Sequence, residues 1–331
     1  MLKDLIKEKY EFIDGDEPIG FGGFSQIFRI RDKKLKNEYI LKKLIKKDPK
    51  NLIKNGTNKT AFENEVKSLI NVKGKNILNI IDYYENDNDN FYYIVLEKMD
   101  GDLENLLQVK YPKGMSSKLI RKIFSQINSG LKLILMNGKC HRDLKPSNIL
   151  YSYINDEKTD FIIKIGDFGL ITDLNETGSN VGSKLFKAPE VENGKYSNKS
   201  DLYSIGIILY YLKTGEYIFE GKKDIEILIN KENNKIKKDT DDEILNNLIK
   251  NLVVKDPHER MEWDDYFNDP FFKVNDENKD TKKKYEFQLN KYEFIYDEPS
   301  YFLGFGEVYR VRDKKSKNRI YFKSNEKKRW K

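Results

Sequence analysis

A single eight-residue loop constrains this chain more than any other part of its sequence. In His141-Arg-Asp-Leu-Lys-Pro-Ser-Asn148, a lysine stands two positions after an aspartate, and an asparagine stands five positions after it. The triplet Asp167-Phe-Gly169 adds a second acid downstream. Carboxylate and amide oxygens are hard ligands that suit magnesium held between protein and phosphates. The spacing therefore predicts a base, a cation and metal ligands in one site.

A glycine-rich turn lies near the start of the chain. Gly20-Phe-Gly22-Gly23 sits between strand-like segments, with Ile19 before it and Ile27 after it. Glycines in such a turn let backbone amides approach a phosphate chain closely. A simple hairpin turn explains the motif equally well. The motif does not open a helix, which argues against a dinucleotide-binding fold.

A lysine and a glutamate are predicted to form an ion pair close to this turn. Lys42 lies in a strand-like segment, and residues 60–71 read as the following helix. Phe62, Glu65 and Leu69 share one face of that helix, at spacings of three and four. An acid on a buried stripe needs a cationic partner. Lys42 is the natural candidate, and its amine would then be held at a phosphate oxygen.

The order of strands and helices predicts an α+β fold with two lobes. Residues 10–45 alternate apolar and polar side chains, and residues 91–99 form a further strand. The rest is mostly helical, with strand-like pieces near 148–151 and 161–166; the expected helices are 102–110, 116–136, 201–213, 223–230, 242–253 and 262–267. A small antiparallel-sheet lobe with one main helix would thus precede a larger helical lobe, with a cleft between them.

Taken together, these motifs resemble the signature set of the eukaryotic protein kinases. The match runs from about Tyr10 to Phe272 and includes Ala188-Pro-Glu190. Asp201 matches the buried aspartate that braces the catalytic loop in that family, and Arg260 matches the arginine that pairs with Glu190. The resemblance implies ATP- and magnesium-dependent transfer of the γ-phosphoryl group to serine or threonine hydroxyls of protein substrates. The alternative is a pseudokinase or nucleotide-binding scaffold without turnover.

The resemblance assigns a role to each polar residue of the predicted cleft. Asp143 would accept or orient the proton of the substrate hydroxyl, and Lys145 would neutralise the γ-phosphoryl group. Lys42, fixed by Glu65, would hold the α- and β-phosphates. Asn148 and Asp167 would hold magnesium. The six polar residues to which the resemblance gives a role are thus Asp143, Lys145, Lys42, Glu65, Asn148 and Asp167. Such a site works by positioning and charge neutralisation.

The nucleotide itself would be held largely by backbone groups. The loop expected to cover the triphosphate consists of Ile19, Gly20, Phe21, Gly22, Gly23, Phe24, Ser25, Gln26 and Ile27. The backbone of Glu97 and Met99 would meet adenine, with Leu96 as the gatekeeper. Two departures from the family pattern stand out, because Ser25 replaces a loop glycine and Ile40 replaces an alanine that adjoins adenine.

The subfamily and its regulation are less sharply defined. Lys145 within the KPSN sequence resembles serine/threonine kinases. GGFSQIF together with KIGDFGL resembles the kinases of translation-initiation factor 2, whereas YFNDPFF is closer to other groups. In the activation segment, 167–190, Thr172, Thr177 and Ser179 are candidate phosphosites, and Arg142 could bind a phosphate there.

The chain contains two nearly identical segments, one near its start and one near its end. FGGFSQIFRIRDKK at 21–34 returns as FLGFGEVYRVRDKK at 302–315, and Lys323 stands where Lys42 stood. The expected organisation is an extension over 1–9, a kinase domain over 10–273 divided near 98/99, a charged linker over 274–284, and a truncated repeat of the small lobe over 285–331. We expect this repeat to be a weakly packed appendage, and the alternative is an arm that adds to a sheet edge.

Composition limits the partners and the compartment. The formal charge of +7 is small against 61 basic and 54 acidic side chains, so nucleic acid is not expected as a partner. The longest apolar run, Ile205–Leu212, is far too short to span a bilayer, so no membrane is expected either. The one cysteine, Cys140, suits a reducing, intracellular and cytoplasmic setting. The oligomeric state is left open.

Overall fold

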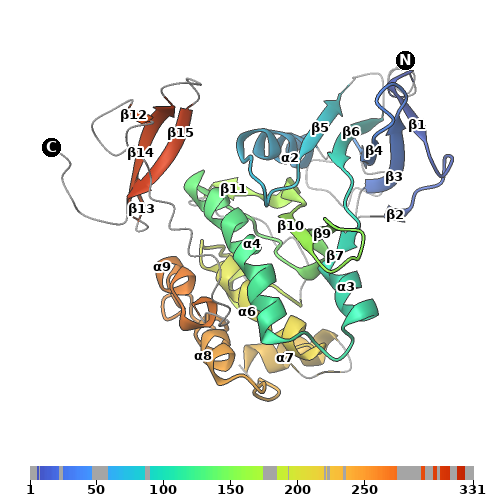
Figure 1. The fold of residues 1–331 in the computed structure, drawn as a ribbon. Helices are drawn as coiled ribbons and strands as arrows, with labels where there is room; N and C mark the ends of the chain where they lie inside the picture. Colours follow the sequence, from blue (N-terminus) through green and yellow to red (C-terminus); the bar gives the residue numbers. More distant parts are fainter. Residues whose placement is uncertain are drawn as a thin grey trace.

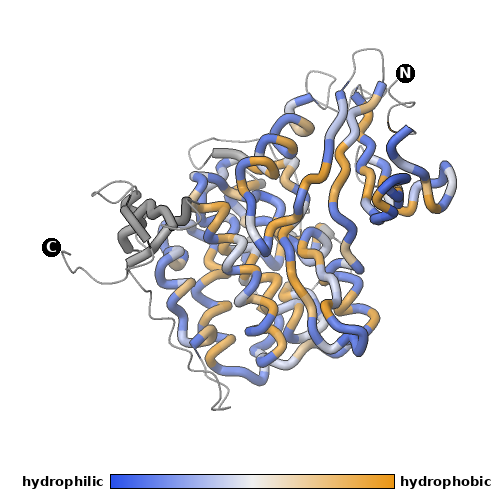
Figure 2. The backbone as a smooth tube through the Cα atoms, turned by 45° about the horizontal axis from the view of Figure 1, so that its top comes forward, coloured by the Kyte–Doolittle hydropathy of each residue, from blue (hydrophilic) through white to orange (hydrophobic). Residues whose placement is uncertain are grey.

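The computed structural model shows the expected α+β architecture, with a sheet-rich lobe above a helical lobe (Figure 1). It describes residues 6, 8–21, 25–46, 59–85, 90–173, 185–192, 194–219, 221, 224–233 and 236–273, and the strands between 292 and 324. Figure 2 shows hydrophobic and hydrophilic residues interleaved along the helices and strands, as expected of elements that bury one face.

The small lobe is built on one six-stranded antiparallel sheet. Its strands are β1 (Tyr10–Phe12), β2 (Gly20–Phe21), β3 (Ser25–Asp32), β4 (Glu38–Ile45), β5 (Ile80–Tyr84) and β6 (Phe91–Glu97), in the order β1-β3-β4-β6-β5 with β2 pairing β3. Ile27 of β3 lies opposite Lys42 of β4, and Ile40 lies opposite Leu96 of β6. This register places the turn, the lysine and the predicted gatekeeper on neighbouring strands.

Helix α2 (Lys59–Asn71) packs against one face of this sheet. Its buried stripe contains Phe62, Glu65 and Leu69, as the periodicity predicts. The Phe62 ring stacks on the Tyr92 ring with centroids 4.4 Å apart. Glu65 is therefore carried toward the sheet on the apolar face of the helix.

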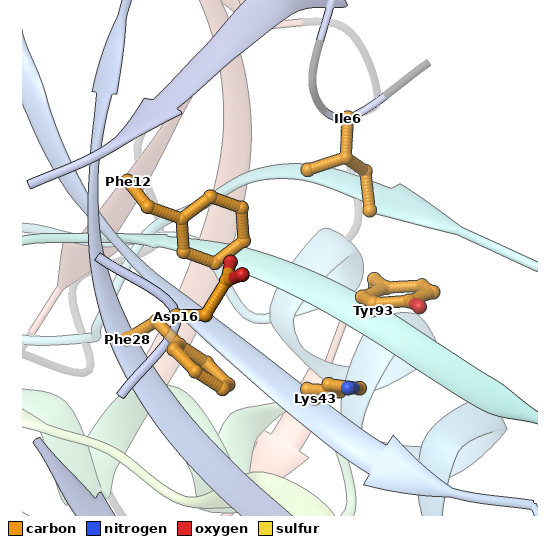
Figure 3. A pocket seen from close by; sticks show the side chains of 6 residues that line it. All are labelled: Ile6, Phe12, Asp16, Phe28, Lys43 and Tyr93. Atoms are coloured by element: carbon orange, nitrogen blue, oxygen red, sulfur yellow. The ribbon is translucent and has the colours of Figure 1, made fainter. Parts of the chain in front are cut away.

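The opposite face of the sheet is covered by the N-terminal segment. Ile6 and Tyr10 join Phe28 and Tyr93 in a second hydrophobic cluster. Figure 3 shows the small cavity beside this cluster, where the Phe12 and Phe28 rings, Ile6, Tyr93, Asp16 and Lys43 surround a hollow. The Lys43 ammonium lies 3.9 Å from the Phe91 ring centroid and 6.0 Å from that of Phe28, so this lysine packs on aromatic rings.

The large lobe is helical around a continuous apolar core. Its helices are α3 (Leu103–Lys110), α4 (Ser117–Met136), α5 (Pro189–Glu192), α6 (Ser200–Thr214), α7 (Asp224–Glu232), α8 (Glu243–Leu252) and α9 (Trp263–Phe267), with short helices η2 (Pro146–Asn148), η3 (Phe168–Leu170) and η4 (Pro270–Phe272). Asp102, Ser116 and Asp242 cap α3, α4 and α8 through their side-chain oxygens. Helix α6 is buried from Ser200 to Leu212, which explains why its sequence is apolar on all sides.

Short strands of the large lobe present the predicted loops. Strands β7 (Gly101–Asp102), β9 (Ile149–Tyr153) and β10 (Phe161–Ile165) form a three-stranded sheet, and β8 (Lys139–Cys140) pairs with β11 (Thr172–Asp173). The eight-residue loop runs from β8 to β9, and Asp167 follows β10. Within the described residues, no helix is both long enough and apolar enough to span a bilayer.

The second copy of the repeated segment folds with the same strand register as the first copy. Strands β12 (Tyr292–Phe294), β13 (Tyr301–Leu303), β14 (Gly306–Asp313) and β15 (Arg319–Ser324) form a sheet of their own (Figure 1). Val308 lies opposite Lys323, just as Ile27 lies opposite Lys42. The described strands of the second copy pair with one another and with none of the small-lobe strands. The linker over 274–284 lies outside the described residues.

Candidate active site

Lys42 joins two carboxylates that come from different lobes. Its Nζ lies 2.8 Å and 2.9 Å from the two carboxylate oxygens of Glu65 and 2.9 Å from Oδ1 of Asp167. The Glu65 side chain is only 1% exposed and that of Lys42 is 13% exposed. The predicted Lys42–Glu65 pair is thus present, and the same ammonium reaches the acid after β10.

The charges of this group depend on one another. Burial opposes the charge of Lys42, but the carboxylates of Glu65 and Asp167 outweigh it and raise the lysine pKa. The Lys42 ammonium lowers the pKa of Asp167 to about 2. Burial raises the pKa of Glu65, and Lys42 opposes that rise. Lys42 and Asp167 therefore carry full charges near neutral pH.

Asp143 is held by the two other polar residues of its loop. Lys145 Nζ lies 2.7 Å from Oδ2 of Asp143. The Asn148 amide nitrogen donates to the Asp143 backbone oxygen at 2.8 Å and to Oδ2 at 3.0 Å. Because the nitrogen of Asn148 faces Asp143, its amide oxygen is the atom available for a metal.

A buried network fixes the shape of this loop. The backbone amides of His141 and Arg142 donate to the two oxygens of Asp201 at 2.8 Å and 2.9 Å. His141 Nε2 bonds the Gly166 carbonyl at 2.9 Å, and its ring meets Phe168 edge to face at 5.5 Å. Asp201, placed by the apolar helix α6, thus connects the loop to the core of the large lobe.

Two non-glycine residues of the site have left-handed backbone conformations. Arg142 has φ 70° and Asp167 has φ 58°. Side chains with a Cβ rarely adopt these angles, and such strain is concentrated at functional sites. At Asp167 this conformation directs the chain from β10 into η3 (Phe168–Leu170).

Glu190 and Arg260 form a second buried ion pair away from the cleft. The guanidinium donates to both carboxylate oxygens, at 2.8 Å and 3.0 Å. The Arg260 side chain is 0% exposed and that of Glu190 is 10% exposed. This is the pairing that the kinase resemblance implied, and it attaches the end of the activation segment to the lower part of the large lobe.

The predicted residues of both lobes line one cavity between them. The residues that the sequence predicted and that line this cavity are Ile19, Gly20, Phe21, Ser25, Ile27, Lys42, Glu65, Leu96, Glu97, Met99, Asp143, Lys145, Asn148 and Asp167. Gln26 is not among the described lining residues, because it pairs with Lys43 and the alternation of β3 directs it to the outer face. Gly22, Gly23 and Phe24 lie outside the described residues, as do Thr177, Ser179 and the side chain of Thr172.

Other lining residues were not predicted from the sequence. Leu78, Leu150, Asp102 and Ser147 contribute to the same cavity. Leu150 lies two positions after Asn148, on the strand that leaves the loop. This short separation from a predicted site residue could have identified Leu150 as a lining residue. Ile40, which replaces the family's alanine beside adenine, also lines the cavity.

The donor set of this cavity suits a divalent cation bound with phosphates. The Asn148 amide oxygen and the ionised Asp167 carboxylate are both hard oxygen donors at the cavity wall. Lys42 and Lys145 add two ammonium groups on either side. A nucleoside triphosphate with a divalent cation matches this combination of cations and oxygen donors.

Comparison with known proteins bears on the whole arrangement. A family model described as the protein kinase domain matches residues 13–272. Calcium-dependent protein kinase 4 of Plasmodium falciparum is 34% identical over 227 residues, covering 68% of this chain and 41% of that protein. Serine/threonine-protein kinase ULK1 of Homo sapiens is 32% identical over 276 residues, covering 80% of this chain and 25% of that protein.

A viral relative is matched over more of its length. The putative serine/threonine-protein kinase R517/R518 of Acanthamoeba polyphaga mimivirus is 28% identical over 296 residues, covering 81% of this chain and 64% of that protein. The resemblance to translation-initiation-factor-2 kinases stays a prediction. Because the family model matches well over half of the sequence, this chain belongs to the protein kinase family.

Proposed function

We propose that this chain is an ATP- and magnesium-dependent protein kinase that phosphorylates serine or threonine in protein substrates. The observation that carries the proposal is the meeting of Lys42 with Glu65 and Asp167 at one cavity that Asp143 also lines. Several relatives are named as serine/threonine-protein kinases, which supports the acceptor class.

Each polar residue has a physical task in this proposal. Lys42, oriented by Glu65, binds phosphate oxygens by charge. Asp143 is oriented by Lys145 and Asn148, so it can accept a hydrogen bond from the substrate hydroxyl and align it for in-line attack. Asn148 and Asp167 would hold magnesium, which when bound would neutralise phosphate charge. The reaction then depends on positioning more than on covalent chemistry.

The test is transfer of labelled phosphate from ATP, with magnesium, to a protein acceptor. Asp143→Asn keeps the shape of the residue and removes its charge, and we expect the rate to fall at least about 10²-fold. Asp239→Asn is the matched control, because Asp239 is 56% exposed and pairs with Lys250 on the surface. Equal rates for wild type and Asp143→Asn remove Asp143 from the mechanism. Phosphoamino-acid analysis of the product distinguishes serine and threonine from tyrosine.

A scaffold without turnover remains the alternative that this assay separates. Ile40 lines the cavity next to Leu96, its partner across the β4–β6 ladder, and is larger than the alanine that the family has there. A protein that binds ATP in calorimetry, but transfers no phosphate with magnesium present, is a scaffold. The intact set of charged residues supports the enzyme, since binding alone does not need Asp143.

We infer that residues 10–273 form the catalytic unit and that 285–331 repeat the opening of a second one. The matching registers of the two copies support this division. Limited proteolysis is expected to cut within 274–284 and to leave an active core. Loss of activity on this cleavage would instead support the alternative, in which residues 285–331 form an arm that adds to a sheet edge of the kinase domain. A single buried cysteine fits a reducing compartment, which supports an intracellular and cytoplasmic location.

A further inference from the structure

An ion pair behind the cavity connects its two ends. Lys164 of β10 and Glu97 at the end of β6 meet with Nζ and Oε1 2.6 Å apart. The Lys164 side chain is 8% exposed and that of Glu97 is 22% exposed. Glu97 lines the nucleotide cavity, whereas Lys164 is not among the described lining residues. The lysine therefore acts on the site only through its partner.

The same carboxylate is also bonded to the loop after helix α2. The Asn79 amide donates to Oε1 of Glu97 at 2.7 Å, and the Glu97 amide donates to the Asn79 carbonyl at 3.1 Å. One residue earlier, the Leu78 amide donates to the Ile165 carbonyl at 2.9 Å. The end of β6, this loop and β10 are thus joined in a closed ring of bonds.

This ring links the two segments that would hold opposite ends of a nucleotide. The Glu97 backbone is expected at adenine, and Asp167, expected at the metal, stands three positions after Lys164. We propose that Lys164 is a positioning residue, which through Glu97 sets the spacing between the adenine-binding segment and Asp167. The proposal rests on the nucleotide-binding part of the proposed function.

Stability alone does not account for a cation at this place. A buried ion pair can often be replaced by neutral groups of similar volume with little loss of folding free energy. A long apolar side chain would fill the same space as Lys164. The pair is therefore expected to affect nucleotide affinity more than folding, and the two quantities can be measured separately.

The double variant Lys164→Met with Glu97→Gln removes both charges together. It leaves no buried charge without a partner, and the glutamine oxygen can still accept from the Asn79 amide. We expect its melting temperature to stay within about 5 °C of wild type. We expect the Kd for magnesium-ATP to rise about 10-fold. The Kd for adenosine, which has no phosphates to reach the metal at Asp167, should stay within about twofold of wild type.

Lys213→Met is the matched control. Lys213 is 11% exposed and pairs with Asp241 at 2.7 Å, at the end of α6 and outside the described cavity lining. Its Kd for magnesium-ATP should stay within about twofold of wild type. The single variant Lys164→Met, which leaves Glu97 without its cation, should weaken binding at least as much as the double variant.

Calorimetric titration of the full chain with magnesium-ATP and with adenosine tests the proposal. A Kd of the double variant for magnesium-ATP within about twofold of wild type overturns it, as does an equal loss of adenosine affinity in the double variant or an equal loss of magnesium-ATP affinity in Lys213→Met. In turnover, a rise in KM for ATP with kcat nearly unchanged supports it, and a fall in kcat alone overturns it. A wild type that binds magnesium-ATP without transferring phosphate defeats the kinase proposal and leaves this test intact.

Discussion

Glu190→Gln should cause a large loss of stability, because it leaves a buried cation without its counter-charge. Arg260 is fully buried, and its remaining acceptors are neutral carbonyls, among them those of Val254 and Lys199. Glutamine also turns an NH₂ group toward a guanidinium that can only donate. Breaking a buried pair in this way costs about 3–5 kcal/mol. In a domain of this size that corresponds to a fall in melting temperature of roughly 10 °C.

The measurement is thermal unfolding followed by calorimetry, with Asp239→Asn as the exposed counterpart. The Asp239 and Lys250 side chains are 56% and 51% exposed and lie 2.9 Å apart, so this change should cost less than about 1 kcal/mol. If Glu190→Gln melts as close to wild type as Asp239→Asn does, the carboxylate of Glu190 is not what compensates Arg260, and the reasoning is wrong.

Three further outcomes are expected. Lys42→Met should lower kcat/KM at least about 10²-fold. The kcat/KM of Lys43→Met, a change on the same strand, should stay within about threefold of wild type, because Lys43 faces the outer aromatic cluster. Equal losses in the two variants contradict the assignment. Asp201→Asn should lower the free energy of unfolding by about 1–3 kcal/mol and reduce kcat, because one loop amide loses its acceptor. An unchanged melting temperature and an unchanged kcat contradict this prediction. Burial raises the pKa of Cys140, so less thiolate forms at any given pH. The native protein should therefore resist iodoacetamide from about pH 7 to 9, while the unfolded chain reacts. Rapid labelling of the native protein contradicts this expectation.

The sequence predicted those contacts that a periodic pattern or a motif encodes. Helical spacing put Glu65 on the buried face of its helix, and the demand for a counter-charge identified Lys42. The kinase resemblance supplied the pair Glu190–Arg260 and the brace at Asp201, which spacing alone does not give. In each case a residue has a chemical need that few partners can meet.

Other contacts leave no such trace in the sequence. Lys164 and Glu97 each sit at a strand position where a charged side chain is ordinarily solvated, and 67 residues separate them. Their meeting depends on how β6 and β10 approach each other across the loop at Asn79. Ile6 was placed in an extension outside the domain, but it is buried against the sheet, since only the folded sheet shows that its outer face needs cover.

The charge balance of the cleft explains why a metal suits this site. Two ammonium groups, those of Lys42 and Lys145, line the cavity, and the carboxyl groups that line it outnumber them: Glu65, Glu97, Asp102, Asp143 and Asp167. Both lysines are already engaged by carboxylates at 2.7–2.9 Å. A triphosphate entering such a site brings further negative charge, which the protein's own cations cannot offset. A divalent cation held at Asp167 would supply the missing positive charge, and the low pKa of Asp167 keeps this carboxylate ionised for that role.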